Sequence, residues 1–322
     1  MTVANAVGVL GAKYPVMLAG MGGVAGPRLV AAVSDAGGIG TLGLYKAPPT
    51  RIAELIKDVR SRTSDIFGVN FVPEVLDDAT LLVNVAAAIQ CSDSSLFISF
   101  FGLPPQGVAR LVHMSGRRLV IQVGSAKDAR TAIEMGVDVL IVQGTEAGGH
   151  LLGTQGIAEI LREVRGINST IRVLVAGGVS CAAEYARLVG PGLADGACCG
   201  TLFVATVESN AHDRYKELIV QSGPNDTVIT DIFEVGWPGR RHRVVNTAQV
   251  QTGKSAAASV IARTRIYGSE SLIFRYSAAV PTQETFGNID DMALYCGVSC
   301  GSIHASQAPA ADVVRSLVGF RG

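Results

Sequence analysis

The sequence lacks the features that mark nucleic-acid-binding and membrane-spanning proteins. Its 27 lysines and arginines are balanced by 27 aspartates and glutamates, and its one short basic cluster is GRRHRV at 239–244. Electrostatic attraction to a phosphate backbone therefore has little support, and we expect no nucleic-acid partner. No run of about 18 apolar residues occurs, so we also expect no membrane partner.

Cysteine patterns typical of metal sites and disulfide frameworks are also missing. The six cysteines form no CxxC pair and show no metal-ligand spacing with histidine, so we expect no bound metal. Cys198 and Cys199 are neighbours in an apolar run, which predicts buried thiols. The first residues, MTVANAVGVLGAKYP, lack the charged start, long apolar stretch and cleavage site of a signal peptide, and we expect a cytoplasmic protein.

Glycine, in contrast, is abundant, with 38 residues that gather at the ends of apolar runs. At such places the backbone must turn sharply or approach a ligand. None of the runs alternates strictly between apolar and polar residues, which indicates strands that are buried on both faces, as in a parallel sheet. The eight runs lie at 15–20, 39–44, 67–72, 96–101, 118–124, 139–145, 173–179 and 196–203.

Segments with helical spacing separate these runs. In the segment at 126–136, Ala129, Ala132 and Ile133 share one face and Gly136 is placed to end the helix. Eight strand–helix units in about 200 residues predict an α/β fold, a (β/α)8 TIM barrel. An open, doubly wound sheet is the alternative, but it would show one glycine-rich fingerprint, whereas here glycines follow nearly every strand.

The rhythm of the runs ends near residue 205. A helix is expected over 210–222, with Asn210 as its N-cap. The polar, irregular segment that follows cannot be divided into further barrel units. We therefore predict a barrel over 1–221, an inserted subdomain over 222–295 that binds substrate or acts as a lid, and a C-terminal segment over 296–322 that returns to the barrel.

The stretch VQGTEAGGHLLG at 142–153 places His150 directly after two glycines, just beyond the sixth run. Active sites of barrels lie at the carboxyl ends of the strands, so His150 is expected at the barrel mouth. An imidazole with a pKa near 6.5 can accept a proton near neutral pH, which suits a general base. A structural bond to a loop carbonyl is the alternative, but Gly148 and Gly149 would clear space beside the ring and favour catalysis.

Two further glycine motifs end the seventh and eighth runs. They supply Gly177 and Gly178 in VAGGVS, and Gly200 and Thr201 in CCGTLF. Loops at these two positions of a barrel commonly hold a phosphate through backbone N–H groups and a helix N-terminus. Each motif alone could serve a tight turn, but the pair favours a phosphate-bearing ligand.

Three other strand ends provide contacts suited to a flat ring. Met21 and Gly22, in AGMGGVAGP at 19–27, would let bare backbone and a soft thioether lie against it. Asn70 and Gln122 carry amides that can donate to and accept from a ring edge. With the phosphate cradle opposite, this set predicts FMN. The dinucleotide fingerprint followed by an acidic residue is absent, which disfavours a nicotinamide cofactor bound as in a Rossmann fold.

These stretches resemble the nitronate monooxygenases, formerly called 2-nitropropane dioxygenases, over nearly the whole chain. The resemblance implies an FMN-binding barrel with a smaller appended domain, in which His150 is the catalytic histidine. It also implies that the residues predicted above at the strand ends line FMN and that Gly297, Ser299 and Gly301 close over it. The matching stretches are AAVSDAGGIGTLG, FGVNF, VQGTEAGGH, VLVAGGV, GTLFVATVESNAHDRYK and RYSAAVPTQETFGNIDDMALYCGVSCGSI.

The implied reaction is the oxidation of alkyl nitronates or nitroalkanes with O2 to carbonyl compounds and nitrite, with His150 as general base. The same signature is similar to that of the FMN-dependent enoyl-acyl carrier protein reductases, in which NAD(P)H reduces the flavin. A flavin-binding accessory protein and a phosphate-binding lyase or synthase remain further alternatives. The implied partners are a small-molecule substrate and O2, and a homodimer is compatible with the sequence.

The chain departs from the nitronate monooxygenase pattern at two places. Leu151 and Leu152 follow His150 where the family often has an arginine, and Phe100 and Phe101 replace a histidine-containing variant at strand four. Fewer positive charges beside the histidine disfavour a small, doubly charged anion such as propionate 3-nitronate. The pattern predicts a more apolar pocket wall.

Overall fold

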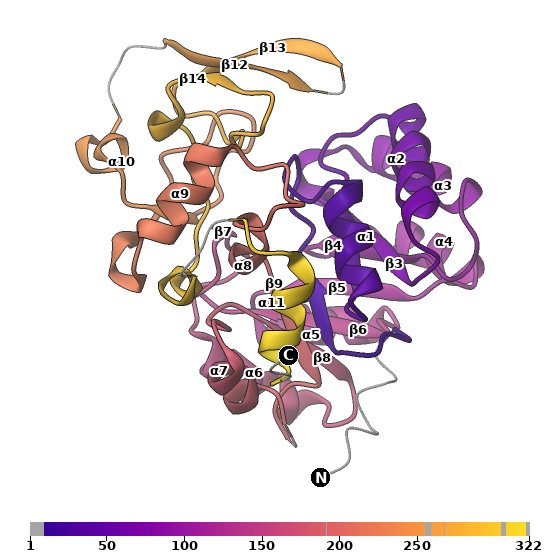
Figure 1. Ribbon diagram of the computed structural model, residues 1–322. Coiled ribbons are helices and arrows are strands. Elements are labelled where there is room, and N and C mark those ends of the chain that lie inside the picture. Colours follow the sequence, from indigo (N-terminus) through magenta and orange to yellow (C-terminus); the bar gives the residue numbers. More distant parts are fainter. Residues whose placement is uncertain (1–9, 191, 255–258, 267, 304–306, 320–322) are drawn as a thin grey trace.

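An eight-stranded parallel sheet forms the centre of the computed structural model, which describes residues 10–190, 192–254, 259–266, 268–303 and 307–319 (Figure 1). Its strands follow the order β1-β9-β8-β6-β5-β4-β3-β2, and a parallel bridge between Met17 and Ile39 joins the two ends. The predicted (β/α)8 barrel is confirmed. The strands are β1 (Val16–Leu18), β2 (Gly40–Gly43), β3 (Phe67–Phe71), β4 (Phe97–Phe101), β5 (Leu119–Val123), β6 (Val139–Gln143), β8 (Arg172–Ala176) and β9 (Gly196–Cys199).

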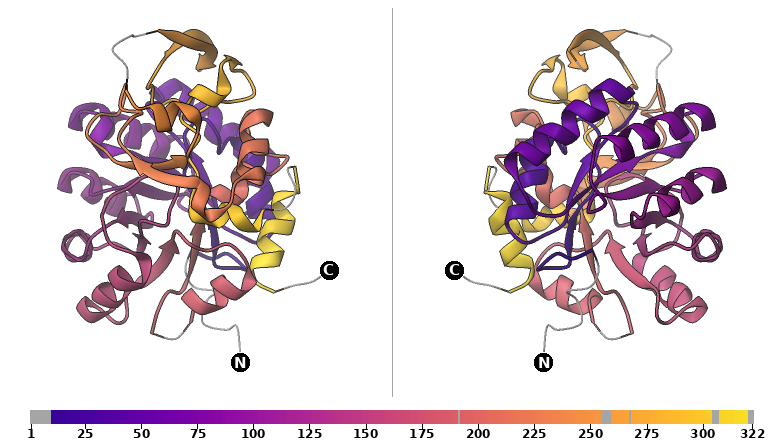
Figure 2. Two further views of the ribbon diagram at one scale, coloured as in Figure 1. Left: turned by 90° about the vertical axis from the view of Figure 1, so that its left-hand side faces the viewer. Right: turned by 90° about the vertical axis from the view of Figure 1, so that its right-hand side faces the viewer.

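Helices cover the outside of this sheet (Figure 2). On α5 the predicted buried face is present, since Ala129 and Ala132 are fully buried, and the N–H of Gly136 ends the helix by donating to the carbonyl of Ile133 at φ +79°. The last helix, α11, packs against α1. The helices are α1 (Pro27–Asp35), α2 (Pro49–Arg62), α3 (Asp78–Gln90), α4 (Gln106–Met114), α5 (Ala126–Glu134), α6 (Ile157–Ile167), α7 (Ala182–Leu188), α8 (Thr201–Val204), α9 (Asp213–Gln221), α10 (Ala248–Thr252) and α11 (Ala310–Leu317).

Two apolar layers hold the barrel together. One fills its interior, where the ring of Phe97 occupies the space that a side chain at Gly68 would need, with a Cβ there lying 2.2 Å from the ring. The other lies between the sheet and the helices and includes most of the buried aliphatic residues of α1 to α6. Burial of this much apolar surface is the main stabilising contribution in such a fold. The packed interior leaves the carboxyl ends of the strands as the place for a site.

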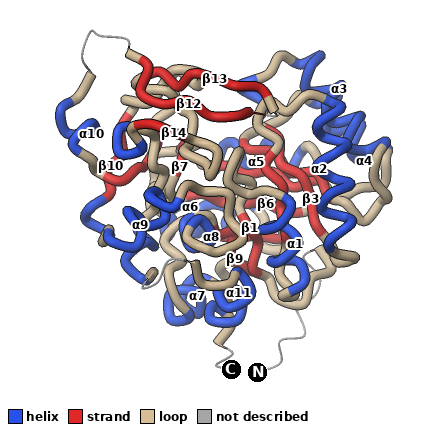
Figure 3. The backbone as a smooth tube through the Cα atoms, turned by 45° about the horizontal axis from the view of Figure 1, so that its top comes forward, coloured by secondary structure: helices blue, strands red, loops and turns tan. Residues whose placement is uncertain are grey.

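The segment at 222–303 and the two-residue strand β7 (Gly149–His150) of the barrel form two small antiparallel sheets beside the barrel mouth, together with short helical turns (Figure 3). These strands were not predicted, because most of this segment is irregular in sequence. One sheet has the order β10-β11-β7 and the other β13-β12-β14. The elements of the segment are β10 (Thr227–Thr230), β11 (His242–Val245), β12 (Val260–Ile266), β13 (Ser269–Phe274), β14 (Phe286–Gly287) and the 3-10 turns Pro224–Asp226, Ile289–Asp291 and Val298–Ser302, and a further turn, Pro73–Val75, follows β3.

The prediction that Asn210 caps a helix is wrong. Helix α9 begins at Asp213, and its N-cap is His212, whose ring Nδ1 accepts a hydrogen bond from the N–H of Arg214 at 3.0 Å. Ala211 forms an antiparallel bridge with Thr282, and this pairing keeps the preceding residues extended. The eighth apolar run likewise ends as a strand at Cys199, and its last residues start α8.

All six cysteines are free, and Cys198 and Cys199 are buried, as predicted. Burial raises the pKa of the Cys199 thiol to about 12, which keeps it protonated and unreactive. Within the described ranges there is no group of three or more metal-ligating side chains, and no helix that is both long and apolar enough to cross a membrane.

Candidate active site

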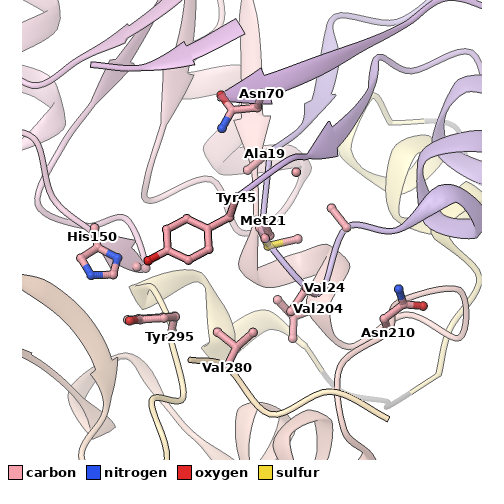
Figure 4. Close-up of a pocket in the computed structure, with 18 of the residues that line it drawn as sticks. Ala19, Met21, Val24, Tyr45, Asn70, His150, Val204, Asn210, Val280 and Tyr295 are labelled. Carbon is pink, nitrogen blue, oxygen red and sulfur yellow. The ribbon is translucent and has the colours of Figure 1, made fainter. Parts of the chain in front are cut away.

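A cavity of about 590 Å³ opens at the carboxyl ends of the barrel strands and is covered on its other side by the segment 237–299 (Figure 4). Ligand pockets in proteins commonly have volumes of roughly 300–1,000 Å³. The cavity is lined by every residue predicted from the strand ends: Met21, Gly22, Asn70, Gln122, Gly148, Gly149, His150, Gly177, Gly178, Gly200 and Thr201. The structure therefore brings the predicted site residues together at one place.

The two predicted amides face this cavity with free hydrogen-bonding groups. The Oδ1 atom of buried Asn70 accepts a hydrogen bond from the Ser99 hydroxyl at 3.1 Å, which leaves its Nδ2 group available (Figure 4). The side chain of Gln122 on β5 has no hydrogen-bond partner among the described residues and also lines the cavity. A ligand with acceptor and donor atoms on a ring edge would satisfy both.

The predicted phosphate cradle lies on the loops that follow β8 and β9. Gly177 and Gly178 adopt φ values of +107° and +74°, a region that favours glycine. A Cβ on Gly177 would lie 2.7 Å from the backbone nitrogen of Ala147, so a larger residue does not fit there. The Thr201 hydroxyl oxygen accepts from the N–H of Gly297 at 3.0 Å and keeps its own hydrogen to donate. The helices that follow these loops have only 7 and 4 residues, too short for a strong helix dipole. A phosphate in the predicted cradle would therefore depend on hydrogen bonds from the N–H groups of the loops.

Some of the predicted glycines also allow close packing between segments. A Cβ on Gly148 would lie 2.4 Å from the backbone nitrogen of Gly297, and one on Gly22 would lie 2.6 Å from Cβ of Tyr45. Gly148 is therefore needed so that the loop after β6 can touch the returning chain. Gly149 has φ +81° and open space around it, and its role beside His150 stays a prediction.

Of the three residues near the carboxyl end that the family resemblance placed over the flavin, one lines the cavity. Ser299 lies in the cavity wall. Gly297 packs behind the wall against Gly148, and a Cβ on Gly301 would meet the ring of Pro224 at 2.7 Å. The two glycines therefore hold the returning chain close to its neighbours.

His150 is buried within a cluster of aromatic rings. Its imidazole is stacked on the indole of Trp237, with ring centroids 3.7 Å apart and an angle of 17° between the planes. The rings of Tyr295 and His242 lie 5.1 Å and 5.2 Å away. The Nε2 atom of His150 is buried and has no hydrogen-bond partner among the described residues. Most buried polar groups in folded proteins are paired, so this atom calls for an explanation.

The environment of His150 keeps its imidazole neutral. Burial, together with the nearby His242 and Arg240, lowers the pKa of the ring from 6.5 to about 3. A neutral imidazole offers one donor and one acceptor nitrogen. An anion bound beside the ring would raise this pKa and so favour the protonated imidazole.

Buried Gln143 fixes the backbone that carries His150, and sequence reasoning missed it. Its Nε2 group donates to the carbonyl of His150 at 2.9 Å, and its Oε1 atom accepts from the N–H of Leu152 at 2.9 Å. The backbone of His150 also pairs with His242 on β11, which ties the barrel to the subdomain. Gln143 ends β6, so its position at a strand end was the signal that could have identified it.

The aromatic residues around His150 were also missed. Tyr45, Trp237 and Tyr295 all line the cavity, although about 190 and 60 residues separate neighbouring members of this set along the chain. Trp237 is the one tryptophan of the sequence and stands in an otherwise polar segment, EVGWPGRR. A single large apolar residue in such a segment signals a contact with another part of the molecule.

Comparisons with known proteins show the family to which the chain belongs. The family profile described as nitronate monooxygenase matches residues 5–319. The chain is 31% identical over 252 residues to a Mycobacterium tuberculosis protein named (3aS,4S,5R,7aS)-5-hydroxy-7a-methyl-1-oxo-octahydro-1H-indene-4-carboxyl-CoA dehydrogenase, which covers 77% of this chain and 68% of that protein. It is 26% identical to a probable nitronate monooxygenase of Staphylococcus aureus, over 76% of this chain and 78% of that protein.

Comparison with solved structures identifies proteins of the same fold. The fold is similar to that of FabK from Thermotoga maritima, with a TM-score of 0.78, 24% identity and coverage of 97% and 93% of the two chains. It is also similar to nitroalkane oxidase from Streptomyces ansochromogenes, with a TM-score of 0.73, 25% identity and 95% coverage of each chain. The chain therefore belongs to the nitronate monooxygenase family and is an oxidoreductase.

Proposed function

We propose that this protein binds FMN and oxidises alkyl nitronates or nitroalkanes with O2 to carbonyl compounds and nitrite. The observation that supports this most strongly is the convergence of three groups on one cavity: an unpartnered His150, free amides at strand ends, and bare backbone after β8 and β9. Membership of the nitronate monooxygenase family makes this chemistry the first choice.

The residues present fit FMN. Gly177 and Gly178 turn their loop with positive φ values, and Thr201 adds a hydroxyl donor, so this end of the cavity suits a phosphate. At the other end Asn70 and Gln122 hold free amide groups for the edge of a flavin ring. When bound, FMN supplies the redox chemistry by taking electrons from the substrate and passing them to dioxygen.

The residues of the chain then act as follows in this proposal. His150 is neutral at physiological pH because burial and nearby charges lower its pKa to about 3. The negative charge of a nitronate, or the charge that develops as a nitroalkane loses its proton, raises this pKa, so that the imidazole can hold the proton. Gln143 holds the backbone of His150 in place through two hydrogen bonds. The rings of Trp237 and Tyr295 exclude water from the imidazole, which strengthens its interaction with an anion.

The likeness to FabK favours a second candidate, the NAD(P)H-dependent reduction of an enoyl thioester. The two functions differ in what reduces the flavin. FMN-loaded protein should be mixed without oxygen with butyl nitronate in one sample and with NADH or NADPH in another. We expect the nitronate to change the visible spectrum of the flavin and the nicotinamides to leave it oxidised. Rapid bleaching by NAD(P)H with no response to nitronate would select the reductase instead.

A further inference from the structure

The indole of Trp237 fills the space directly beside the imidazole of His150. It is stacked on His150 at 3.7 Å, it is nearly parallel to the ring of Tyr45 at 5.5 Å, and its edge meets the ring of Phe101 at 5.6 Å. We call the space that the indole occupies the indole site. Three aromatic or heteroaromatic rings surround it, and the indole itself is buried.

This arrangement closes the Nε2 atom of His150, although the residue itself lines the cavity. Nε2 is buried and has no hydrogen-bond partner among the described residues, so no substrate atom can reach this nitrogen in this conformation. A group that takes part in proton transfer must come within about 2.6–3.2 Å of the reacting atom, directly or through one water. Some part of the cover must therefore move before Nε2 can act. The ring in closest contact with the imidazole is Trp237.

Trp237 lies on a loop, residues 233–242, whose base is closed by one side chain. The Nδ1 atom of the His242 imidazole lies 3.0 Å from the carbonyl oxygen of Arg240. Its Nε2 atom accepts a hydrogen bond from the N–H of Phe233 at 3.3 Å. Within the loop, Gly236 and Gly239 have φ values of +94° and +73°, with open space around both. A closed base and glycines beside the tip let the tip move without unfolding the sheet.

The tip of this loop is held shut by polar contacts from the barrel. The Tyr45 hydroxyl and the Lys46 ammonium group donate to the carbonyl of Gly236 at 3.1 Å and 2.9 Å. The carboxylate of Glu74 accepts from the indole N–H of Trp237 and from the guanidinium of Arg240. These partners come from the chain after β2 and after β3, and each contact of this kind contributes little on its own.

Among the described residues, the positive charges nearest the indole site already have polar partners. Arg240, whose charge reaches His150, is paired with Glu74, and Lys46 is bound to the carbonyl of Gly236. Arg243, on the strand beside His150, donates to the carbonyl of Thr145 and to the hydroxyl of Thr227. The remaining charged residues of the cavity, Arg51, Asp58, Glu146, Arg265 and Glu284, come from α2, the loop after β6, β12 and the turn before β14.

We propose that the substrate reaches the Nε2 atom of His150 by displacing the Trp237 indole, and that it therefore has a flat or apolar carbon skeleton whose one charge lies at the reacting group. Aromatic walls stabilise such a skeleton as they stabilise the indole. A second carboxylate would be buried without a counter-charge, which is costly. The chemistry of this inference rests on the proposed function, whereas the displacement and the ligand class can be tested by binding alone.

The binding test uses FMN-loaded protein and two carboxylates that imitate nitronates. Phenylacetate has one charge and a flat apolar body, and succinate has a charge at each end. We expect phenylacetate to bind at least about tenfold more tightly and to change the fluorescence of Trp237, the one tryptophan of the chain. Equal or tighter binding of succinate would overturn the ligand class. Binding of phenylacetate with unchanged fluorescence would overturn the displacement.

Variants separate displacement from general loosening of the fold. In Trp237→Ala no indole has to leave, so phenylacetate, followed through the flavin spectrum, should bind about two- to tenfold more tightly than to wild type. The affinity of Trp237→Phe for phenylacetate should lie between those of wild type and Trp237→Ala. Phe286→Ala removes an aromatic ring that is 69% exposed on β14 and serves as the matched control, with unchanged affinity. Weaker binding in Trp237→Ala would show that the indole supports the ligand, which contradicts the proposal.

The turnover test compares two nitronates. The anion of phenylnitromethane should show a kcat/KM at least about tenfold above that of propionate 3-nitronate, and Trp237→Ala should raise the first value more than the second. The reverse preference would overturn the ligand class. If neither nitronate is turned over, the proposed function fails, and the binding test still decides the inference.

Discussion

The two sides of the cavity are built in different ways. The barrel side consists of backbone and short side chains at strand ends, such as Gly177, Gly178 and Asn70. The subdomain side adds the rings of Trp237 and Tyr295 to small apolar and polar side chains, and these two rings pack against His150 from distant segments. The barrel side is thus suited to hold a cofactor in one position, and the subdomain side to select and admit a substrate. His150 lies where the two sides meet.

Removing the imidazole at this meeting point should have the largest effect. In His150→Asn we expect FMN binding to be retained, because the predicted cradle lies on other loops, and kcat/KM with neutral nitroalkanes to fall by about 10²–10⁴-fold, the usual contribution of a general base. Steady-state oxygen consumption measures the rate, and the flavin spectrum measures cofactor content. Full activity in this variant would leave His150 with a structural role only.

Substitution of a single glycine on the barrel side should weaken FMN binding. Gly177→Ala should weaken FMN binding at least about tenfold, because φ +107° is strained for alanine and its Cβ would lie 2.7 Å from the backbone of Ala147. Gly166→Ala, on α6 with open space around it, is the matched control and should bind FMN normally. Titration of the apoprotein with FMN gives both dissociation constants. Equal affinity in the two variants would remove Gly177 from the cradle.

The two hydrogen bonds by which Gln143 holds the backbone around His150 should contribute to the free energy of unfolding. Gln143→Leu leaves the carbonyl of His150 and the N–H of Leu152 without partners, and we expect a loss of about 2–4 kcal/mol in the free energy of unfolding. Gln251→Leu, which removes an exposed hydrogen bond on α10, should cost less than about 0.5 kcal/mol. Urea unfolding measures both, and similar losses in the two variants would contradict the role given to Gln143.

The burial of His150 also predicts a pH dependence of stability. Because the folded pKa is lowered from 6.5 to about 3, the unfolded chain binds more protons between these values. The stabilising contribution is therefore complete above pH 6.5 and is lost as the pH falls toward 3. In the FMN-free protein, His150→Gln should show a smaller loss of stability between pH 7 and pH 5 than wild type. Identical losses in urea unfolding would indicate that the ring is not desolvated.

The sequence was informative about the barrel side because its signals are local. Eight apolar runs with glycines after them predict parallel strands, and residues that follow such strands meet at one edge whatever the details of the loops. Met21, Asn70 and Thr201 could therefore be assigned to one site without knowledge of any contact between them. Gln143 obeys the same rule, and it was overlooked although it also ends a strand.

The subdomain side depends on contacts that the sequence does not encode locally. Tyr45 stacks on Trp237, and Tyr295 packs against His150, whose two-residue strand pairs with β11. Four strands of this region have four residues or fewer, so their periodicity is weak. Asn210 was misplaced as a cap for the same reason, since a bridge between Ala211 and Thr282 overrides the local preference.

The most direct test of the central claim is a crystal structure of the protein with FMN supplied in excess. We expect the isoalloxazine ring to lie across the barrel mouth, in contact with Met21 and Asn70, with the phosphate on the loops of Gly178 and Thr201 and with His150 facing the same cavity. FMN bound elsewhere, or side chains filling the mouth with His150 turned away from the ring, would contradict the account.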